Sequence, residues 1–340
     1  MEKKCFEFTK GILHQAISDG VFPSAVCAIG VKNESMFLDA AGDATLSTLY
    51  DAASLTKILS TAMIALRAIE DGILALSDPI SCFFDAPDDK ATITIQNLLT
   101  HTGGFEPFFL LEEEKDGPDR AVSCILRRPL AAPPTGTPRY SCMGYILLGK
   151  ILEKVHREPL NIIARRVVFE PLGMRHTGYL PKKGDFAPTE IDPTTGAAWC
   201  GVVHDENARY LGGVSGNAGV FTNIGDCARY AAMLANGGRG FLSGAMFQKA
   251  IQNHTPGHET HRGLGFQLAG TEGSFFGSLL PAHSFGHTGF TGTSIAVEPA
   301  SGLYVVLLTN RVHPSRENTK ILRFRRIFHD AIYGHYRKYI

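Results

Sequence analysis

The 340-residue sequence has no excess charge of either sign, no long apolar run and no closely spaced pair of cysteines. Lys and Arg total 33, and Asp and Glu also total 33, so no net field attracts nucleic acid or an anionic membrane. No window approaches the ~18 consecutive apolar residues that a membrane span needs. These absences favour a small-molecule partner and argue against nucleic-acid and membrane partners.

Cysteine usage and the first residues bear on the cellular location. The seven cysteines are scattered without a C-x-x-C pair, a pattern more typical of reduced thiols than of a disulfide framework. The first twenty residues place apolar positions at helical spacing and contain no apolar core of a secretory signal, so we expect an amphipathic helix there. Both observations predict a cytoplasmic location.

Stretches with strand character lie near both ends of the chain. Residues 24–31 and 35–41 are predicted to be strands joined by a turn at 32–34, and residues 291–297 and 304–309 are predicted to be two more. Apolar periodicity predicts helices between these strands and one after them, at residues 54–71, 94–100, 119–127, 143–155, 159–168, 226–236 and 318–333.

This order of elements predicts an α+β fold. We expect an antiparallel β-sheet built from both termini and flanked by helices, with a large, mostly helical lobe inserted between its strands. The predicted units are a sheet lobe of residues 1–78 plus 241–340 and a helical lobe of residues 79–240. Small-molecule sites often form between lobes, so the active site is expected in the cleft.

The strongest chemical signal is Ser54-Leu55-Thr56-Lys57 at the start of a long predicted helix. Positions i and i+3 share a helix face, so the Lys57 amine can reach the Ser54 hydroxyl. A buried lysine can lose its proton near neutral pH and act as a base for serine, and the helix N-terminus favours developing negative charge. This spacing is common by chance, so its weight depends on accompanying motifs.

Two further triplets follow in order, Tyr140-Ser141-Cys142 before a predicted helix and His287-Thr288-Gly289 opening a predicted strand. With Ser-x-x-Lys, this series resembles the penicillin-recognising serine hydrolases, which include class C β-lactamases, D-Ala-D-Ala carboxypeptidases and family VIII esterases. The likeness extends over roughly residues 45–310, through the runs at 51–57, 97–104, 134–136, 144–149, 170–174 and 286–293.

The resemblance implies a role for each motif. Ser54 would be the nucleophile, Lys57 its base, and Tyr140 a second proton carrier that serves the leaving group and then water. The backbone N–H groups of Ser54 and Phe290 would form the oxyanion hole. Gly289 and Gly292 would let the substrate approach the strand edge. The family's β-lactamase/transpeptidase-like fold agrees with the predicted sheet and lobe.

Substrate contacts are implied for Cys142, His287, Thr288, Gly289 and His204. The last of these lies in the segment 203–207, which the resemblance places over the cleft.

Two of these positions depart from the family's usual residues. Cys142 replaces an Asn that binds the acyl-side amide, and His287 replaces the Lys of class C β-lactamases, although carboxypeptidases and some esterases of the family also carry His there. Both changes favour hydrolysis of a small ester, amide or short peptide over efficient β-lactam hydrolysis. A D-Ala-D-Ala carboxypeptidase or weak β-lactamase is the alternative.

Other interpretations stay open at this point. His254, His258 and His261 could bind zinc, although loop residues fix no ligand geometry, so no metal and no cofactor are expected. Cys142 is an alternative nucleophile, and His101 is expected to be structural. A non-catalytic binder on the same scaffold is the alternative from another class of protein.

Overall fold

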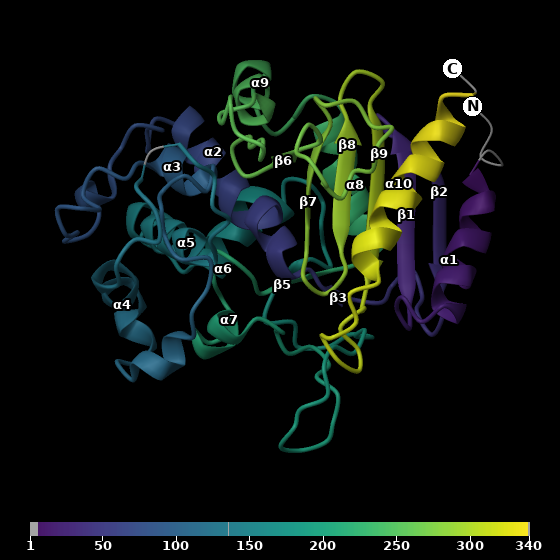
Figure 1. Ribbon diagram of the computed structural model, residues 1–340, viewed down its shortest axis with the longest axis horizontal. Helices are drawn as coiled ribbons and strands as arrows, with labels where there is room; N and C mark the ends of the chain where they lie inside the picture. The colour runs from purple at the N-terminus through teal and green to yellow at the C-terminus, as the bar shows by residue number, and fades with distance from the viewer. Residues whose placement is uncertain (1–5, 135, 339–340) are drawn as a thin grey trace.

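The structure is a computed structural model and describes residues 6–134 and 136–338. Its centre is a six-stranded antiparallel sheet in the order β2-β1-β9-β8-β7-β6 (Figure 1). The strands are β1 (Ala25–Val31), β2 (Glu34–Ala41), β6 (Gln267–Leu268), β7 (Phe285–Thr288), β8 (Ser294–Glu298) and β9 (Leu303–Thr309). Strand β1 pairs with β2 on one side and with β9 on the other, so the two ends of the chain build one sheet. The predicted α+β fold is confirmed.

Alternating side chains of the central strands feed two separate cores. In β1, Val26 and Ala28 pack in the larger core, whereas Cys27 packs in the smaller one, as the two-residue period of a strand requires. Helices α1 and α10 cover the face of the smaller core, and α8 packs against the opposite face (Figure 1). The helices are α1 (Phe8–Ser18), α2 (Ala62–Glu70), α3 (Ile95–Leu99), α4 (Ala121–Arg127), α5 (Cys142–His156), α6 (Leu160–Ala164), α7 (Glu206–Tyr210), α8 (Ile224–Ala235), α9 (Gly244–Ile251) and α10 (Ile321–Tyr336).

A small second sheet connects the segment just before Ser54 to the middle of the chain. It has the order β3-β5-β4, with β3 (Tyr50–Asp51), β5 (Val220–Thr222) and β4 (Gly178–Tyr179). The lobe boundaries at residues 78 and 240 stay a prediction. Helix α8 lies within the predicted helical lobe but packs against the large sheet.

The predicted helix over residues 54–71 has a more complex geometry than expected. Residues Ala53–Leu55 form a 3₁₀ turn, Lys57–Thr61 form a π-helical turn, and the α-helix begins only at Ala62. The Thr61 hydroxyl donates to the carbonyl of Gly216 at 2.7 Å, so a neighbouring segment holds this stretch. The spacing of apolar residues gives no information about tertiary hydrogen bonds of this kind, so it predicted a regular helix. Turns with π geometry inside helices are frequent at functional sites.

The prediction that His287-Thr288-Gly289 opens a strand is wrong in its detail. His287 and Thr288 are the last residues of β7, residues 289–293 form a turn, and β8 begins at Ser294 rather than at residue 291. Gly292 has a φ of 115°, a backbone conformation that a strand-forming residue rarely adopts.

The N-terminal prediction is partly tested. Helix α1 lies within the predicted amphipathic stretch, and residues 1–5 lie outside the described part of the chain. Over residues 6–134 and 136–338, no helix combines the length and the apolar character that crossing a bilayer demands. The predicted cytoplasmic location stays a prediction.

Candidate active site

Ser54 lies at a strained point between β3 and the helical segment. The preceding residue, Ala53, has a φ of 46°, which a residue with a Cβ rarely adopts. A buried carboxylate supports this conformation, because the Ala53 N–H donates to Asp51 Oδ1 at 2.8 Å. Backbone strain held by neighbouring groups is typical of functional sites.

Lys57 is buried directly beside the Ser54 hydroxyl. Its Nζ atom lies 3.0 Å from Ser54 Oγ, 3.0 Å from the carbonyl oxygen of Asn217 and 3.5 Å from Cys142 Sγ. The same nitrogen is 5.0 Å from the centre of the Tyr140 ring. The amine therefore touches the serine oxygen from a site that is closed to solvent.

The Lys57 amine, the Tyr140 phenol and the Cys142 thiol together determine the protonation of the site. Burial is the largest single effect on Lys57 and lowers its pKa, but Cys142, Tyr140 and Asp205 together outweigh burial and place that pKa above the ordinary value. Burial raises the pKa of Tyr140 and of Cys142. The raised pKa values of Tyr140 and Cys142 keep the phenol and the thiol protonated at neutral pH, and the upward net shift of the Lys57 pKa differs from the expectation that burial leaves its amine neutral.

Tyr140 is held from the loop before α5. Its ring packs 4.5 Å from the His101 ring and 5.9 Å from the His287 ring. The N–H of Ser141 donates to His101 Nδ1 at 3.1 Å, and the Ser141 hydroxyl caps α5 by accepting from the Gly144 N–H. Burial holds the pKa of His101 well below its usual value, so this histidine is a neutral packing partner.

The turn after β7 is fastened to the strand that leads to Ser54. The Thr291 hydroxyl donates to the carbonyl of Asp51 at 2.8 Å, and the Thr293 hydroxyl donates to the carbonyl of Ala52 at 3.1 Å. A Cβ atom on Gly289 would lie 2.4 Å from the Ala52 oxygen, so only glycine fits this approach. The Phe290 N–H makes no hydrogen bond with another described residue.

His287 provides a neutral imidazole to the site. Its Nδ1–H donates to the carbonyl of Thr288 at 2.7 Å, which leaves Nε2 as a buried lone pair without a partner among the described residues. Burial, with the nearby positive charges of Lys57 and Arg262, lowers the pKa of His287 to about 3. His287 is therefore uncharged at neutral pH, whereas a lysine at this position would be a cation.

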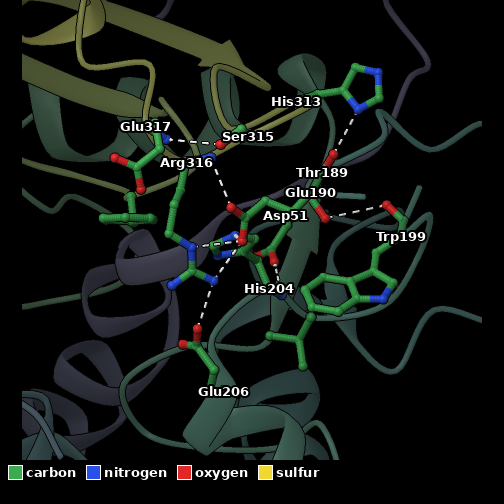
Figure 2. Close-up of polar contacts among 12 residues, drawn as sticks. Asp51, Thr189, Glu190, Trp199, His204, Glu206, His313, Ser315, Arg316 and Glu317 are labelled. Atoms are coloured by element: carbon green, nitrogen blue, oxygen red, sulfur yellow. Dashed lines mark hydrogen bonds and ion pairs between the residues drawn. The ribbon is translucent and has the colours of Figure 1, made fainter. Parts of the chain in front are cut away.

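A charged cluster from the segment 190–206 and the loop before α10 lies against Phe290. Glu190 lies at its centre (Figure 2). One of its oxygens lies 2.8 Å from His204 Nε2 and 2.6 Å from an Arg316 nitrogen. Arg316 also pairs with Glu206 at 2.7 Å. The His204 ring stacks on the Phe290 ring at 5.6 Å, and its backbone N–H donates to Asp51 Oδ2 at 2.7 Å. Asp51 thus connects the turn before Ser54 to His204, the residue whose ring packs against Phe290.

Two cavities meet at Ser54, Tyr140, Phe290 and Arg316. The larger, which we call the arginine cavity, measures about 530 Å³ and is lined by Arg262, His287, Thr288, Arg311, Glu317 and Arg325, among others. The smaller, which we call the carboxylate cavity, measures about 290 Å³ and is lined by Pro107, Phe108, Cys142, His204, Asp205 and Glu206, among others. A substrate carbonyl over Ser54 would have one substituent in each cavity.

Comparisons with known proteins agree on the family. The sequence matches the family described as "Beta-lactamase" over residues 10–329. A protein of Escherichia coli (strain K12) named "Putative D-alanyl-D-alanine carboxypeptidase" is 33% identical over 320 residues, covering 82% of this chain and 73% of that protein. A protein of the same name from Salmonella enteritidis is 30% identical with the same coverage. The chain belongs to the beta-lactamase family.

Solved structures show the same fold at low sequence identity. EstCE1, described as a hydrolase with promiscuous acyltransferase activity, superposes with a TM-score of 0.77 at 23% identity over 98% of this chain and 99% of that one. An octameric penicillin-binding protein homologue from Pyrococcus abyssi gives a TM-score of 0.75 at 20% identity, covering 99% and 80% of the two chains. These likenesses confirm the predicted beta-lactamase-family fold.

The structure brings most of the predicted site residues together in this beta-lactamase-family site. Ser54, Tyr140 and Cys142 all lie around the Lys57 amine. His287, Thr288 and Gly289 line the arginine cavity, and His204 lines the carboxylate cavity. Elsewhere, the His254 ring bonds to the carbonyl of Lys249, and the described residues contain no group of three ligand side chains that could hold a metal.

Sequence reasoning missed Asp51, Arg262 and Glu190. Asp51 and Glu190 act through partners far away in the chain, His204 for Asp51 and Arg316 for Glu190, and Arg262 is placed by its position beside Tyr140 on a cavity wall. The one available signal was the position of Asp51 three residues before the predicted nucleophile, which placed it in the motif without giving it a role.

The raised pKa of Asp51 predicts that the stability of the fold decreases as the pH rises. Burial raises the pKa of Asp51 to about 6, although N–H groups of His204 and Ala53 oppose the rise. The folded chain therefore holds a proton that the unfolded chain releases near pH 4, so this carboxyl group stabilises the fold below pH 4 and that stabilisation is lost as pH rises through 6. The loss amounts to roughly 3 kcal/mol in the free energy of unfolding.

Urea unfolding of wild type and Asp51→Asn between pH 4 and 7 measures this effect. The difference between the two curves isolates Asp51, because buried histidines with lowered pKa values contribute the same opposite slope to both proteins. We expect the wild type to lose stability relative to the variant as pH rises, with exposed Asp43→Asn as the matched control. Parallel curves for all three proteins would contradict the assignment.

Proposed function

We propose that this chain is a serine hydrolase that forms an acyl-enzyme on Ser54 with a small ester or amide. The observation that carries the proposal is the 3.0 Å contact between the buried Lys57 amine and Ser54 Oγ, beside Tyr140 and at the junction of two cavities. A nucleophile, a base within hydrogen-bond reach and room for both halves of a substrate are the parts that acyl transfer requires.

Each group has a distinct step in the proposed reaction. In the fraction of molecules with a neutral Lys57 amine, that amine takes the Ser54 proton while Oγ bonds to the substrate carbonyl carbon. Tyr140 gives a proton to the leaving oxygen or nitrogen, and water later cleaves the ester on Ser54 with the same groups acting in reverse. The N–H groups of Ser54 and Phe290 would stabilise the negative carbonyl oxygen.

The support for an ester or small amide comes from the two departures at Cys142 and His287. A buried thiol and a neutral imidazole replace an amide and a cation that bind β-lactams in the resembling enzymes. The names of the E. coli and Salmonella relatives favour a second candidate, hydrolysis of D-Ala-D-Ala peptides. A non-catalytic binder would retain the cavities without turnover.

The test is covalent labelling followed by mass spectrometry of the intact protein and its peptides. We expect a fluorescent fluorophosphonate to add one label to wild type, on the peptide that contains Ser54, and to leave Ser54→Ala unlabelled. Stable labelling by a fluorescent penicillin as well would promote the carboxypeptidase candidate. If Ser54→Ala is labelled like wild type, or if neither probe reacts with wild type, the acyl-enzyme proposal is wrong.

A further inference from the structure

The two cavities that meet at Ser54 carry opposite charge. Four arginines and one glutamate line the arginine cavity. Two carboxylates and one arginine, Arg316, line the carboxylate cavity, where Glu206 pairs with Arg316 and Asp205 does not. A substrate that spans Ser54 would therefore meet positive charge with one end and negative charge with the other.

Arg262 is a buried cation without a partner of opposite charge. Its side chain is among the buried ones, with 7% of the residue exposed, and it forms no ion pair within the described residues. Its Nε atom makes no hydrogen bond, and its guanidinium lies 5.6 Å from the centre of the Tyr140 ring, on the wall of the arginine cavity. Burying an unpaired charge is costly, so an anion in the cavity would relieve the cost.

The other arginines of this cavity leave its positive charge largely uncompensated. Arg311 donates to the carbonyls of Phe290, Arg316 and Asn318, and Arg325 donates to the carbonyls of Gly289 and Thr293. Carbonyl oxygens satisfy hydrogen bonds without cancelling a full charge. Among these arginines and within the described residues, Arg316 alone forms ion pairs with carboxylates, and the glutamate of the cavity wall, Glu317, is exposed.

Asp205 is the matching group on the opposite side of Ser54. One of its oxygens accepts from the Ala208 N–H at 2.8 Å, and its carboxylate forms no ion pair with a described residue. Its negative charge raises the pKa of both Lys57 and Cys142, which places it electrostatically within the site. The carboxylate cavity is the smaller of the two, so it suits a short substituent that carries a cation.

We propose that the substrate is a small zwitterion, an unblocked dipeptide, whose carboxylate binds Arg262 and whose ammonium lies beside Asp205. The orientation follows from dipeptide chemistry, because the ammonium belongs to the residue that holds the scissile carbonyl and the carboxylate belongs to the residue that leaves. This inference rests on the proposed acyl-enzyme function and narrows its substrate class.

The reaction balances without any further reactant than water. Ser54 Oγ bonds to the carbonyl carbon, the C–N bond breaks, and the leaving nitrogen takes a proton and departs as a free amino acid. Water then cleaves the ester on Ser54 and releases the second amino acid. Arg262 lies against Tyr140, so a carboxylate held there keeps the leaving nitrogen close to the phenol that would protonate it.

The experiment compares one dipeptide in four forms. Ala-Ala is offered unblocked, N-acetylated, C-amidated and doubly blocked, each as the D,D and the L,L isomer, and the released alanine or alanine amide is measured by chromatography. We expect wild type to prefer the unblocked form of at least one isomer, with kcat/KM lowered about tenfold or more by either block.

Two variants separate the two ends of the substrate. Arg262→Gln is expected to abolish the preference for a free carboxylate over an amide and to keep the preference for a free amine. Asp205→Asn keeps a side chain that can cap α7 and is expected to do the reverse. Exposed Arg239→Gln and Asp43→Asn serve as matched controls and should retain both preferences.

The failure of this inference can be told apart from the failure of the proposed function. If the fluorophosphonate labels Ser54 but wild type hydrolyses no unblocked dipeptide, or hydrolyses blocked and unblocked forms equally, the zwitterion inference is overturned and the acyl-enzyme stands. Unchanged selectivity in both variants would also overturn it. An absence of labelling on Ser54 would remove the proposed function itself.

Discussion

Lys57→Met loses about three to four orders of magnitude in kcat/KM for ester and amide substrates alike. Lys57 supplies the amine that contacts Ser54 Oγ, and a positioned base accounts for about 10²–10⁴-fold in rate, with larger losses when nucleophile and base act as a unit. Methionine fills the same space without a titratable group. Steady-state kinetics on a chromogenic ester and on an amide measure the loss.

The same substitution is expected to leave the fold intact or to stabilise it. A buried ammonium costs stability when, as here, no carboxylate of residues 6–134 or 136–338 pairs with it, so its replacement by an apolar side chain of similar length should raise the melting temperature. Lys183→Met, at an exposed position, is the control and should change neither quantity. A variant that is both inactive and less stable would attribute the lost activity to misfolding instead.

The pH profile of wild type gives a second measure of this role. Lys57 has a pKa above its ordinary value, so the neutral amine is the minor form near pH 7. If acylation uses that form, kcat/KM rises about tenfold for each pH unit until the Lys57 pKa or another limit is reached. A profile that is flat from pH 7 to 9 would assign the base role to another group.

The fold could be read from the sequence where a local pattern decides the structure. Strands β1 and β2 and the turn between them were predicted within about one residue, because two short strand-like runs flank the turn residues 32–34. The end of β7 was not predicted correctly, because Gly289 and Gly292 belong to a turn that packs against Ala52 and not to a strand. That contact joins residues more than 200 positions apart.

The residues of the candidate site were likewise predictable only where a local pattern in the sequence decides their position. Ser54 and Lys57 were found because a three-residue spacing on a helix makes a local prediction, even though the helix proved to start as 3₁₀ and π turns. Asp51, Arg262 and Asp205 gain meaning only from distant residues and from cavity walls. A charge that lacks a partner cannot be recognised until all of its neighbours are known.

The position of Phe290 shows how such distant groups converge. Its ring lies against His204 and Arg311, while the adjacent Thr291 bonds to the backbone of Asp51. Asp51 in turn accepts the N–H of Ala53, directly before the nucleophile. The two backbone N–H groups proposed to bind the carbonyl oxygen are thus held by one continuous network, so their spacing should be fixed before substrate arrives.

Tyr140→Phe is expected to separate substrates by their leaving groups. Burial raises the pKa of Tyr140 above its ordinary value, so the phenol keeps its proton at neutral pH and can donate it. An amide nitrogen must be protonated to leave, whereas a p-nitrophenolate leaves as an anion. We therefore expect kcat for an amide to fall about 10²-fold or more and kcat for a p-nitrophenyl ester to fall less than about tenfold.

Phenylalanine retains the ring contacts with His101 and His287, so the substitution removes only the hydroxyl. Tyr333→Phe, outside both cavities, is the control and should leave both rates unchanged. Equal losses for amide and ester would mean that Tyr140 acts before the leaving group departs, for example by taking the Ser54 proton. In that case Lys57, permanently charged, would serve to hold the phenolate, and the roles proposed for the two residues would be exchanged.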